Sequence, residues 1–113
     1  TLHANSARDA ISRLETLVLL TGCAWPLRAI RQQIASALDI VVQLRRDRDG
    51  RRGVSEILEI CGTDGDILLT HSVFCRNVGT EPLRWTQTPP RFIRDLPSED
   101  RDRILAMLSK DGA

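Results

Sequence analysis

The sequence predicts an α+β fold in a single domain that spans residues 1–113. Three observations carry this prediction. Two stretches near the N-terminus place apolar residues three and four positions apart, which is the period of an amphipathic helix. Three β-branched runs of strand length follow, separated by short turns. A last helical stretch lies near the C-terminus, so the predicted order is two helices, a three-stranded antiparallel meander and one helix.

The first helix is predicted from a capping signal and an apolar stripe. Ser6 and Asp9 have the spacing of a capping box, with Asp in place of the preferred Glu. The helix is expected to run to about Leu20 and to stop at Gly22, because glycine suits the left-handed residue that ends many helices. Its predicted apolar face consists of Ala10, Ile11, Leu14, Leu17 and Val18.

A second helix is predicted to begin near Pro26, because proline is favoured in the first helical turn. Arg28 and Arg31 fall outside its apolar stripe and are expected on other faces. The predicted buried stripe consists of Leu27, Ile30, Ile34, Ala37 and Leu38.

Three strands are predicted at residues 40–44, 54–60 and 67–74, which are rich in β-branched and apolar side chains. Asp49-Gly50 is a turn signal between the first two strands, and residues 62–66 form a second turn. Because these connections are short, the strands are expected to pair antiparallel.

The remaining segments are predicted to be less regular. Residues 1–4 read as a short strand, whose edge would be unpaired and is therefore expected to be disordered, refolded or paired with another copy. Residues 76–97 are predicted to be irregular, since they contain a glycine and several prolines. A terminal helix is predicted over residues 98–109, with Ile104, Leu105 and Leu108 buried.

Composition argues against several classes of protein. Hydrophobic residues make up 42% and charged residues 27% of the chain, which is typical of a globular domain. The net charge of +1 creates no overall field for nucleic acid or an anionic membrane. No run approaches the roughly 20 apolar residues of a membrane span, and no signal peptide is recognised. Because the sequence begins at Thr1 rather than at methionine, we expect a piece of a longer chain.

The cysteines predict no metal site. Cys23, Cys61 and Cys75 lie far apart, and no CxxC pair occurs. The two histidines of the chain cannot complete a usual zinc site with them. The three cysteines are therefore expected to be small core residues in a reducing compartment.

The most informative stretch is Thr1-Leu-His-Ala-Asn-Ser6, with residues 8–15 behind it. A histidine between a strand end and a capped helix can donate a hydrogen bond to an anion at the helix N-terminus. Taken alone, His3 is more often a structural residue than a ligand-binding one.

With its neighbours, the stretch resembles a known family. TLHANS followed by RDAISRLE is similar to the histidine box of the type II/IV secretion ATPases, and most similar to the tight-adherence (Flp) pilus assembly ATPases. The resemblance covers residues 1–75 and includes the helix at 26–39, the strand at 40–44 and residues 59–62. Residues 89–92 resemble the family's terminal signature.

The resemblance implies the C-terminal portion of a RecA-like P-loop ATPase. Such a protein is a hexameric motor that hydrolyses ATP with Mg²⁺ to drive pilus assembly or protein export. The implied partners are the other subunits of a homo-hexamer and inner-membrane platform proteins. The implied location is cytoplasmic and peripheral to the inner membrane. No GxxxxGKS or GxxxxGKT sequence occurs in this chain, so the fragment alone is expected neither to hold ATP and Mg²⁺ nor to hydrolyse ATP.

The resemblance also assigns individual residues. His3 matches the histidine-box residue, whose implied catalytic and nucleotide-binding role is at the γ-phosphate end of the site. Arg13 matches an arginine of the next helix. It either reaches toward the nucleotide site or a subunit boundary, or pairs with Glu15 or a carboxylate on a neighbouring element. Arg31 matches another family arginine, for which an ion pair within the chain is expected.

Two other functions stay open. In the first, the meander and last helix form a non-catalytic interaction or oligomerisation module. In the second, the five arginines within residues 45–52 contact nucleic acid. No aromatic residue is interleaved to stack on bases, and Asp47 and Asp49 interrupt the positive charge. A solvated hairpin tip is therefore favoured, and no nucleic-acid partner is expected.

Overall fold

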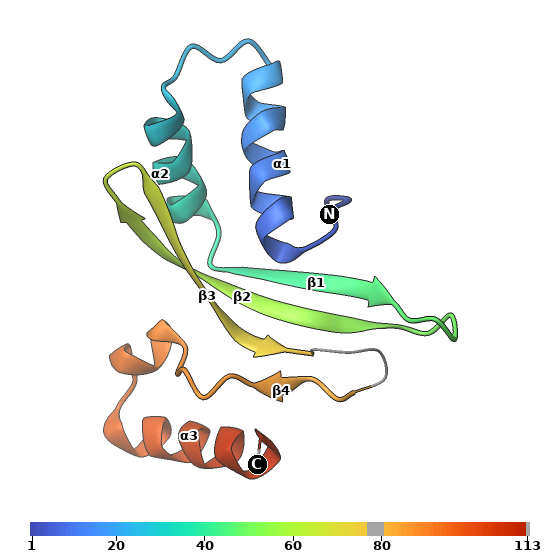
Figure 1. Cartoon of the computed structure of the whole chain (residues 1–113). Helices are drawn as coiled ribbons and strands as arrows, with labels where there is room; N and C mark the ends of the chain where they lie inside the picture. The colour runs from blue at the N-terminus through green and yellow to red at the C-terminus, as the bar shows by residue number, and fades with distance from the viewer. Residues whose placement is uncertain (77–80, 113) are drawn as a thin grey trace.

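The computed structural model describes residues 1–76 and 81–112 and confirms the α+β class (Figure 1). Two helices come first, an antiparallel sheet follows, and a helix ends the described chain. The elements are α1 (Ala7–Leu20), α2 (Leu27–Ala37), β1 (Ile40–Arg46), β2 (Arg52–Asp64), β3 (Ile67–Cys75), β4 (Arg84–Trp85), the 3-10 helix η1 (Arg91–Asp95) and α3 (Ser98–Gly112).

The sheet has four strands in the order β1-β2-β3-β4, all antiparallel to their neighbours. The predicted three-stranded meander is therefore one strand short. The strand that the sequence did not predict is β4. In it Trp85 pairs with Phe74, and the Thr86 amide that follows donates to the carbonyl of Val73 at 2.9 Å. A two-residue strand is too short to show an alternating pattern in the sequence.

The predicted irregular segment 76–97 thus contains both β4 and η1 in its described part. Residues 77–80 of that segment lie outside the described residues. Its prolines do not prevent local order, because Pro90 precedes η1 at a position that needs no helical hydrogen bond from its nitrogen.

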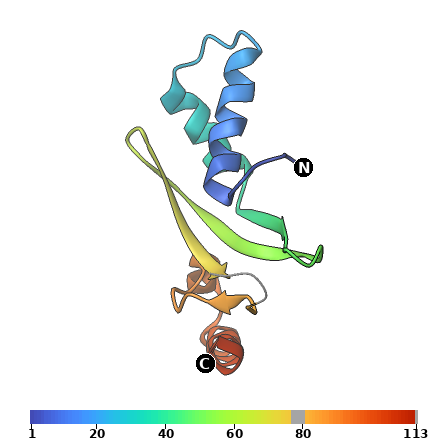
Figure 2. The same cartoon turned by 45° about the vertical axis from the view of Figure 1, so that its right-hand side comes forward.

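The helices lie on two sides of the sheet. Figures 1 and 2 show α1 and α2 on one side, and η1 and α3 on the other. Successive residues of a strand point to opposite faces, so neighbouring positions of β2 face different helices. None of the described helices is long and apolar enough to cross a membrane.

The main core lies between α1, α2 and the sheet. Ile30 and Leu58 are its most deeply buried large side chains, with exposed fractions of 2% and 0%. The buried cluster consists of Ala7, Ile11, Ile30, Ile34, Leu58 and Ile60. Three residues of the predicted apolar stripes, Leu17, Leu27 and Ala37, are exposed. Periodicity identifies the apolar side of a helix, but the extent of the sheet beneath decides how much of that side is covered.

The predicted start of α1 is confirmed. The Ser6 hydroxyl accepts a hydrogen bond from the Asp9 amide at 3.0 Å, and the Asp9 carboxylate accepts one from the Asn5 amide at 2.9 Å. These two bonds form the reciprocal capping box. Gly22, with φ +80°, follows the helix as expected.

The predicted strand over residues 1–4 does not form in the described chain. Instead, the side-chain amide of Gln43 on β1 donates to the carbonyl of Ala4 at 3.0 Å. The expected lack of backbone pairing within the chain is thus confirmed for the described residues, and a side chain ties this segment to the sheet.

Candidate functional site

The two sequence-predicted site residues lie before α1 and near its middle. His3 is exposed in the segment that precedes the helix. Arg13 has a side chain that is 47% exposed, and its Nε donates to Asp9 Oδ2 at 2.9 Å. Arg13 therefore pairs with a carboxylate of its own helix, and that carboxylate is Asp9 rather than Glu15.

Asp9 controls the electrostatics of this helix end. The Asn5 amide, followed by the Arg13 guanidinium, lowers the pKa of the Asp9 carboxyl. An ionised carboxylate in the first turn favours the helix dipole, and it also occupies the place where an anion would bind. Any anion that approaches Arg13 would therefore compete with Asp9 for the guanidinium.

Arg31 forms the ion pair within the chain that the sequence predicts. Its Nε donates to Glu15 Oε1 at 2.9 Å, and a second guanidinium nitrogen donates to the Asp66 carbonyl at 2.6 Å. The Glu15 hydrogen bond raises the pKa of Arg31. These contacts join α1, α2 and the β2–β3 turn beside a shallow groove of about 420 Å³ that Arg8, Glu15 and Arg31 help to line.

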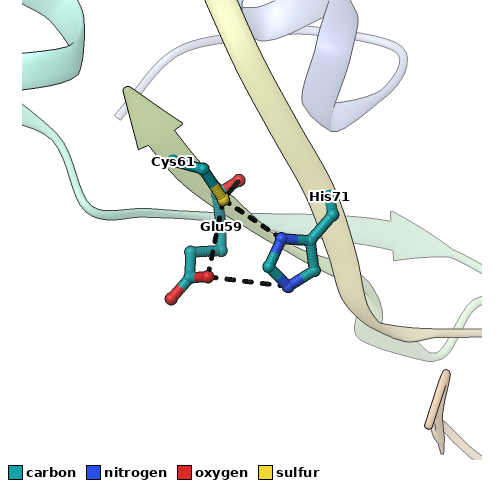
Figure 3. Close-up of side chains that lie close together, drawn as sticks. All are labelled: Glu59, Cys61 and His71. Carbon is teal, nitrogen blue, oxygen red and sulfur yellow. Dashed lines mark hydrogen bonds and ion pairs between the residues drawn. The ribbon is translucent and has the colours of Figure 1, made fainter. Parts of the chain in front are cut away.

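A second constellation lies on the side of the sheet away from α1 and α2. Glu59 and Cys61 of β2 and His71 of β3 point toward one another (Figure 3). Cys61 Sγ is 3.1 Å from His71 Nδ1 and 3.6 Å from Glu59 Oε1. Glu59 Oε1 is also 3.5 Å from His71 Nε2. We call these three residues the Glu-Cys-His cluster.

Strand register explains how the cluster forms. Glu59 and His71 are direct partners across β2 and β3. The register shifts between Ile60 and Gly62, so that Cys61 is an extra residue with no partner on β3. This β-bulge brings a thiol to the Glu59–His71 pair, and bulges often re-aim side chains in this way.

The carboxylate of the cluster is buried and held firmly. Glu59 is 6% exposed, and its two carboxylate oxygens accept the Arg91 amide at 2.8 and 3.0 Å. The Arg91 guanidinium in turn donates to the Cys61 carbonyl. Arg91 begins η1, so this 3-10 helix fixes the position of Glu59 against the strands.

The histidine and the cysteine are less well satisfied. His71 Nε2 is buried, and its approach to Glu59 has no hydrogen-bond geometry, so it makes no hydrogen bond within the described chain. Burial, followed by the Glu59 charge, raises the pKa of the Cys61 thiol, while Arg91 and Arg94 oppose this shift. The free thiol is therefore protonated at neutral pH, which argues against an activated thiolate nucleophile.

The cluster borders an open groove of about 560 Å³. Glu59 and Cys61 line it from β2, and Arg91 and Phe92 line it from η1, with Asp39 before β1 completing one wall. The groove gives small ligands access to two of the three cluster residues.

Sequence reasoning missed this cluster. The count of cysteines and histidines left out Glu59, and Cys61 was expected to be a core residue. In the structure all three cysteines are only half-buried. The sequence did contain a signal for the cluster. Glu59 and Cys61 lie two residues apart, and His71 lies on the next predicted strand.

Comparison with known proteins gives one relationship. No protein-family model matches the chain. Over 67 residues, or 59% of the chain, it is 33% identical to a protein named "Putative conjugal transfer protein" in two strains of Mycobacterium tuberculosis, CDC 1551 / Oshkosh and H37Rv. The chain spans about a fifth (18%) of the length of these curated relatives. This similarity supports a relation to conjugal transfer proteins.

Proposed function

We propose that this chain is the C-terminal part of a type II/IV secretion ATPase, of the tight-adherence pilus assembly branch. In this proposal the parent protein is a cytoplasmic homo-hexamer at the inner membrane. It hydrolyses ATP to drive pilus assembly or protein export. The observation that carries the proposal is the 67-residue similarity to conjugal transfer proteins. The resemblance of TLHANS and RDAISRLE to the histidine box of the type II/IV secretion ATPases also supports it.

The geometry at α1 is compatible with the roles proposed for His3 and Arg13. His3 is exposed just before the N-terminus of α1, where the helix dipole favours anions. Arg13 lies about two turns further along the same helix, and its charge is shared with Asp9. We infer that His3 contacts the γ-phosphate end of ATP and that Arg13 exchanges Asp9 for phosphate when nucleotide binds.

The residues of this chain do not by themselves fit ATP and Mg²⁺. The sequence holds no GxxxxGKS or GxxxxGKT loop to cradle the phosphates with backbone amides. The two amides that the capping box uses, those of Asn5 and Asp9, already have acceptors. In the proposed parent protein, other segments supply the phosphate loop and the magnesium ligands, and this chain supplies His3 and Arg13.

ATP turnover of the full-length parent tests the proposal. We expect His3→Ala to reduce kcat by about 100-fold or more, which is the usual range for a group that stabilises developing charge. Oligomer size, measured by light scattering, should not change. Arg13→Ala should also lower turnover, whereas Arg103→Ala on α3 serves as the matched arginine control. A parent that has no phosphate-binding loop, or that hydrolyses ATP at the normal rate with His3→Ala, would contradict the proposal.

The alternative function is a non-catalytic oligomerisation module, and one feature favours it. Ile40, Val42 and Leu44 alternate along β1 and are 47%, 52% and 63% exposed. An apolar strip of this kind suits contact with a neighbouring subunit. The Val42→Glu variant of the parent, with its oligomer size measured, distinguishes the ATPase function from the oligomerisation module. Dissociated oligomers after Val42→Glu, combined with normal turnover after His3→Ala, would favour the interaction module.

A further inference from the structure

We propose that Glu59, Cys61 and His71 bind a zinc ion through Oε1, Sγ and an imidazole nitrogen. This inference does not depend on the proposed ATPase function, because it rests on the opposite side of the sheet from His3 and Arg13. The primary observation is that one potential ligand atom from each residue lies within 4.8 Å of the other two. A carboxylate, a thiolate and an imidazole are all ligands that zinc accepts.

The distances between the ligand atoms suit a tetrahedral ion. With bond lengths of about 2.3 Å to sulfur and about 2.1 Å to oxygen, the 3.6 Å between Cys61 Sγ and Glu59 Oε1 corresponds to an angle of about 110° at zinc. The 3.5 Å between Glu59 Oε1 and His71 Nε2 gives a similar angle of about 115–120°. Cys61 Sγ approaches the other ring nitrogen, Nδ1, at 3.1 Å. A single ion therefore requires His71 to rotate so that one ring nitrogen faces both Cys61 and Glu59.

The charges and hydrogen bonds of the cluster also fit a divalent cation. On binding the ion, the Cys61 thiol releases its proton to solvent. Glu59 and the resulting Cys61 thiolate then carry two negative charges, which one Zn²⁺ balances, and His71 binds as a neutral ring. His71 Nε2 is buried and makes no hydrogen bond among the described residues, so a metal would give it a partner. Each buried polar atom of this kind calls for an explanation, and an ion is one.

The surroundings supply the outer shell that metal ligands need. The Arg91 amide binds both Glu59 oxygens and fixes the carboxylate, while leaving lone pairs for a metal. The groove beside Glu59 and Cys61 gives access to the fourth coordination position, which water or a small anion would take. A site with three protein ligands and one open position is the arrangement of catalytic rather than purely structural zinc.

Two other interpretations, a simple hydrogen-bonded pair and a site for a hard cation, explain the cluster less completely. A hydrogen-bonded Cys61–His71 pair would use one ring nitrogen and leave the other buried without a partner. Hard cations such as Mg²⁺ prefer all-oxygen sites, so a thiol and an imidazole select against them. Zinc is therefore the ion that the donor set favours.

Metal titration of the 113-residue chain tests the inference. The protein is treated with a chelator, titrated with Co²⁺ as a spectroscopic probe, and then with Zn²⁺ in competition. We expect one equivalent of Co²⁺ to give the absorption of a tetrahedral site with a thiolate-to-cobalt band, and Zn²⁺ to displace it. Cys61→Ser and His71→Ala should each weaken Zn²⁺ binding at least about 100-fold, because loss of a supporting residue alone costs about 10–100-fold. Cys75→Ser, which changes a half-buried cysteine of β3 outside the cluster, is the matched control.

A second measurement needs no variant and so is independent of folding defects. Alkylation of each cysteine of the wild-type chain is followed by mass spectrometry with and without Zn²⁺, and with Mg²⁺ for comparison. Zn²⁺ should slow alkylation of Cys61 at least tenfold and leave Cys23 and Cys75 unchanged, while Mg²⁺ should have no effect. Equal alkylation of Cys61 with and without Zn²⁺, or Co²⁺ binding that survives Cys61→Ser, would overturn the proposal.

Discussion

The two faces of β2 bury neighbouring residues for opposite physical reasons. Leu58 and Ile60 face α1 and α2 and pack in the main core with exposed fractions of 0% and 8%. Glu59 lies between them in the sequence, faces η1, and is buried to a similar degree. Burial of the two apolar side chains is favourable in itself, whereas burial of the carboxylate is costly unless partners compensate.

This difference teaches what each face contributes. The helix face requires only volume and shape, so any well-packed apolar set of the right size would serve it. The η1 face requires particular partners, namely the Arg91 amide, Cys61 and His71. We therefore expect the helix face of β2 mainly to determine stability, and the η1 face to carry the proposed zinc site.

Truncation of the helix face should have the largest effect. Leu58→Ala removes a fully buried side chain and leaves a cavity, so it should lower the free energy of unfolding by about 2–5 kcal/mol. Urea denaturation followed by circular dichroism measures this change. Leu20→Ala is the control, because that side chain is 77% exposed and its loss should cost less than about 0.5 kcal/mol. Similar losses for the two variants would erase the contrast between core and surface.

Truncation of the η1 face should have a smaller effect. Glu59→Ala removes the charged acceptor of the part-buried Arg91 amide hydrogen bond and should cost about 1–3 kcal/mol in free energy of unfolding. Hydrogen exchange measured by NMR should show faster exchange of the Arg91 amide. Glu81→Ala replaces an exposed glutamate and is the control. Unchanged protection of Arg91 after Glu59→Ala would show that η1 is held by other contacts.

Loss of the α1 cap should have a further, smaller effect on the helix face. Ser6→Ala removes the acceptor of the Asp9 amide and should lower the free energy of unfolding by about 1 kcal/mol. Thermal unfolding measures this loss, with Ser36→Ala on the exposed side of α2 as the control. If both variants unfold at the same temperature as the wild type, the capping box does not anchor α1.

The smallest expected effect is the acid dependence that Asp9 contributes. Its pKa is lower in the folded chain than the ordinary value of 3.8, so its contribution to stability is fully present above that value and is lost as the pH falls through the folded pKa. We expect the wild type to unfold at a higher temperature than Asp9→Asn at about pH 5, and this difference to shrink steadily as the pH falls below 3.8. A difference that is independent of pH would exclude an electrostatic origin.

Local patterns in the sequence predict much of the fold. The Ser6–Asp9 capping box, the three-and-four spacing behind it and the glycine after the helix place α1 correctly. The β-branched runs and Asp49-Gly50 place β1 and β2, and Gly50 adopts the left-handed conformation that such a turn requires. These features depend on a few adjacent residues, so the sequence specifies them without tertiary context.

Contacts between distant residues are not predicted in this way. Arg31 of α2 pairs with Glu15 of α1, sixteen residues earlier, and only the packing of the two helices brings these side chains together. Arg13 pairs instead with Asp9, four residues earlier on its own helix face, because Glu15, two residues away, lies on another face. The position of β4 also depends on contacts with β3 that only the folded sheet supplies.

The Glu-Cys-His cluster shows most clearly which features local sequence determines and which features only the tertiary structure determines. The sequence determines that Glu59 and Cys61 lie near the end of one strand and that His71 lies on the next. Pairing continued without interruption from Asp64 opposite Ile67 would place Ser72, not His71, opposite Glu59. The bulge at Cys61 shifts the register by one residue, and a one-residue shift moves every later side chain to the other face. That shift, which depends on how the whole sheet packs between α2 and η1, is what brings a carboxylate, a thiol and an imidazole together.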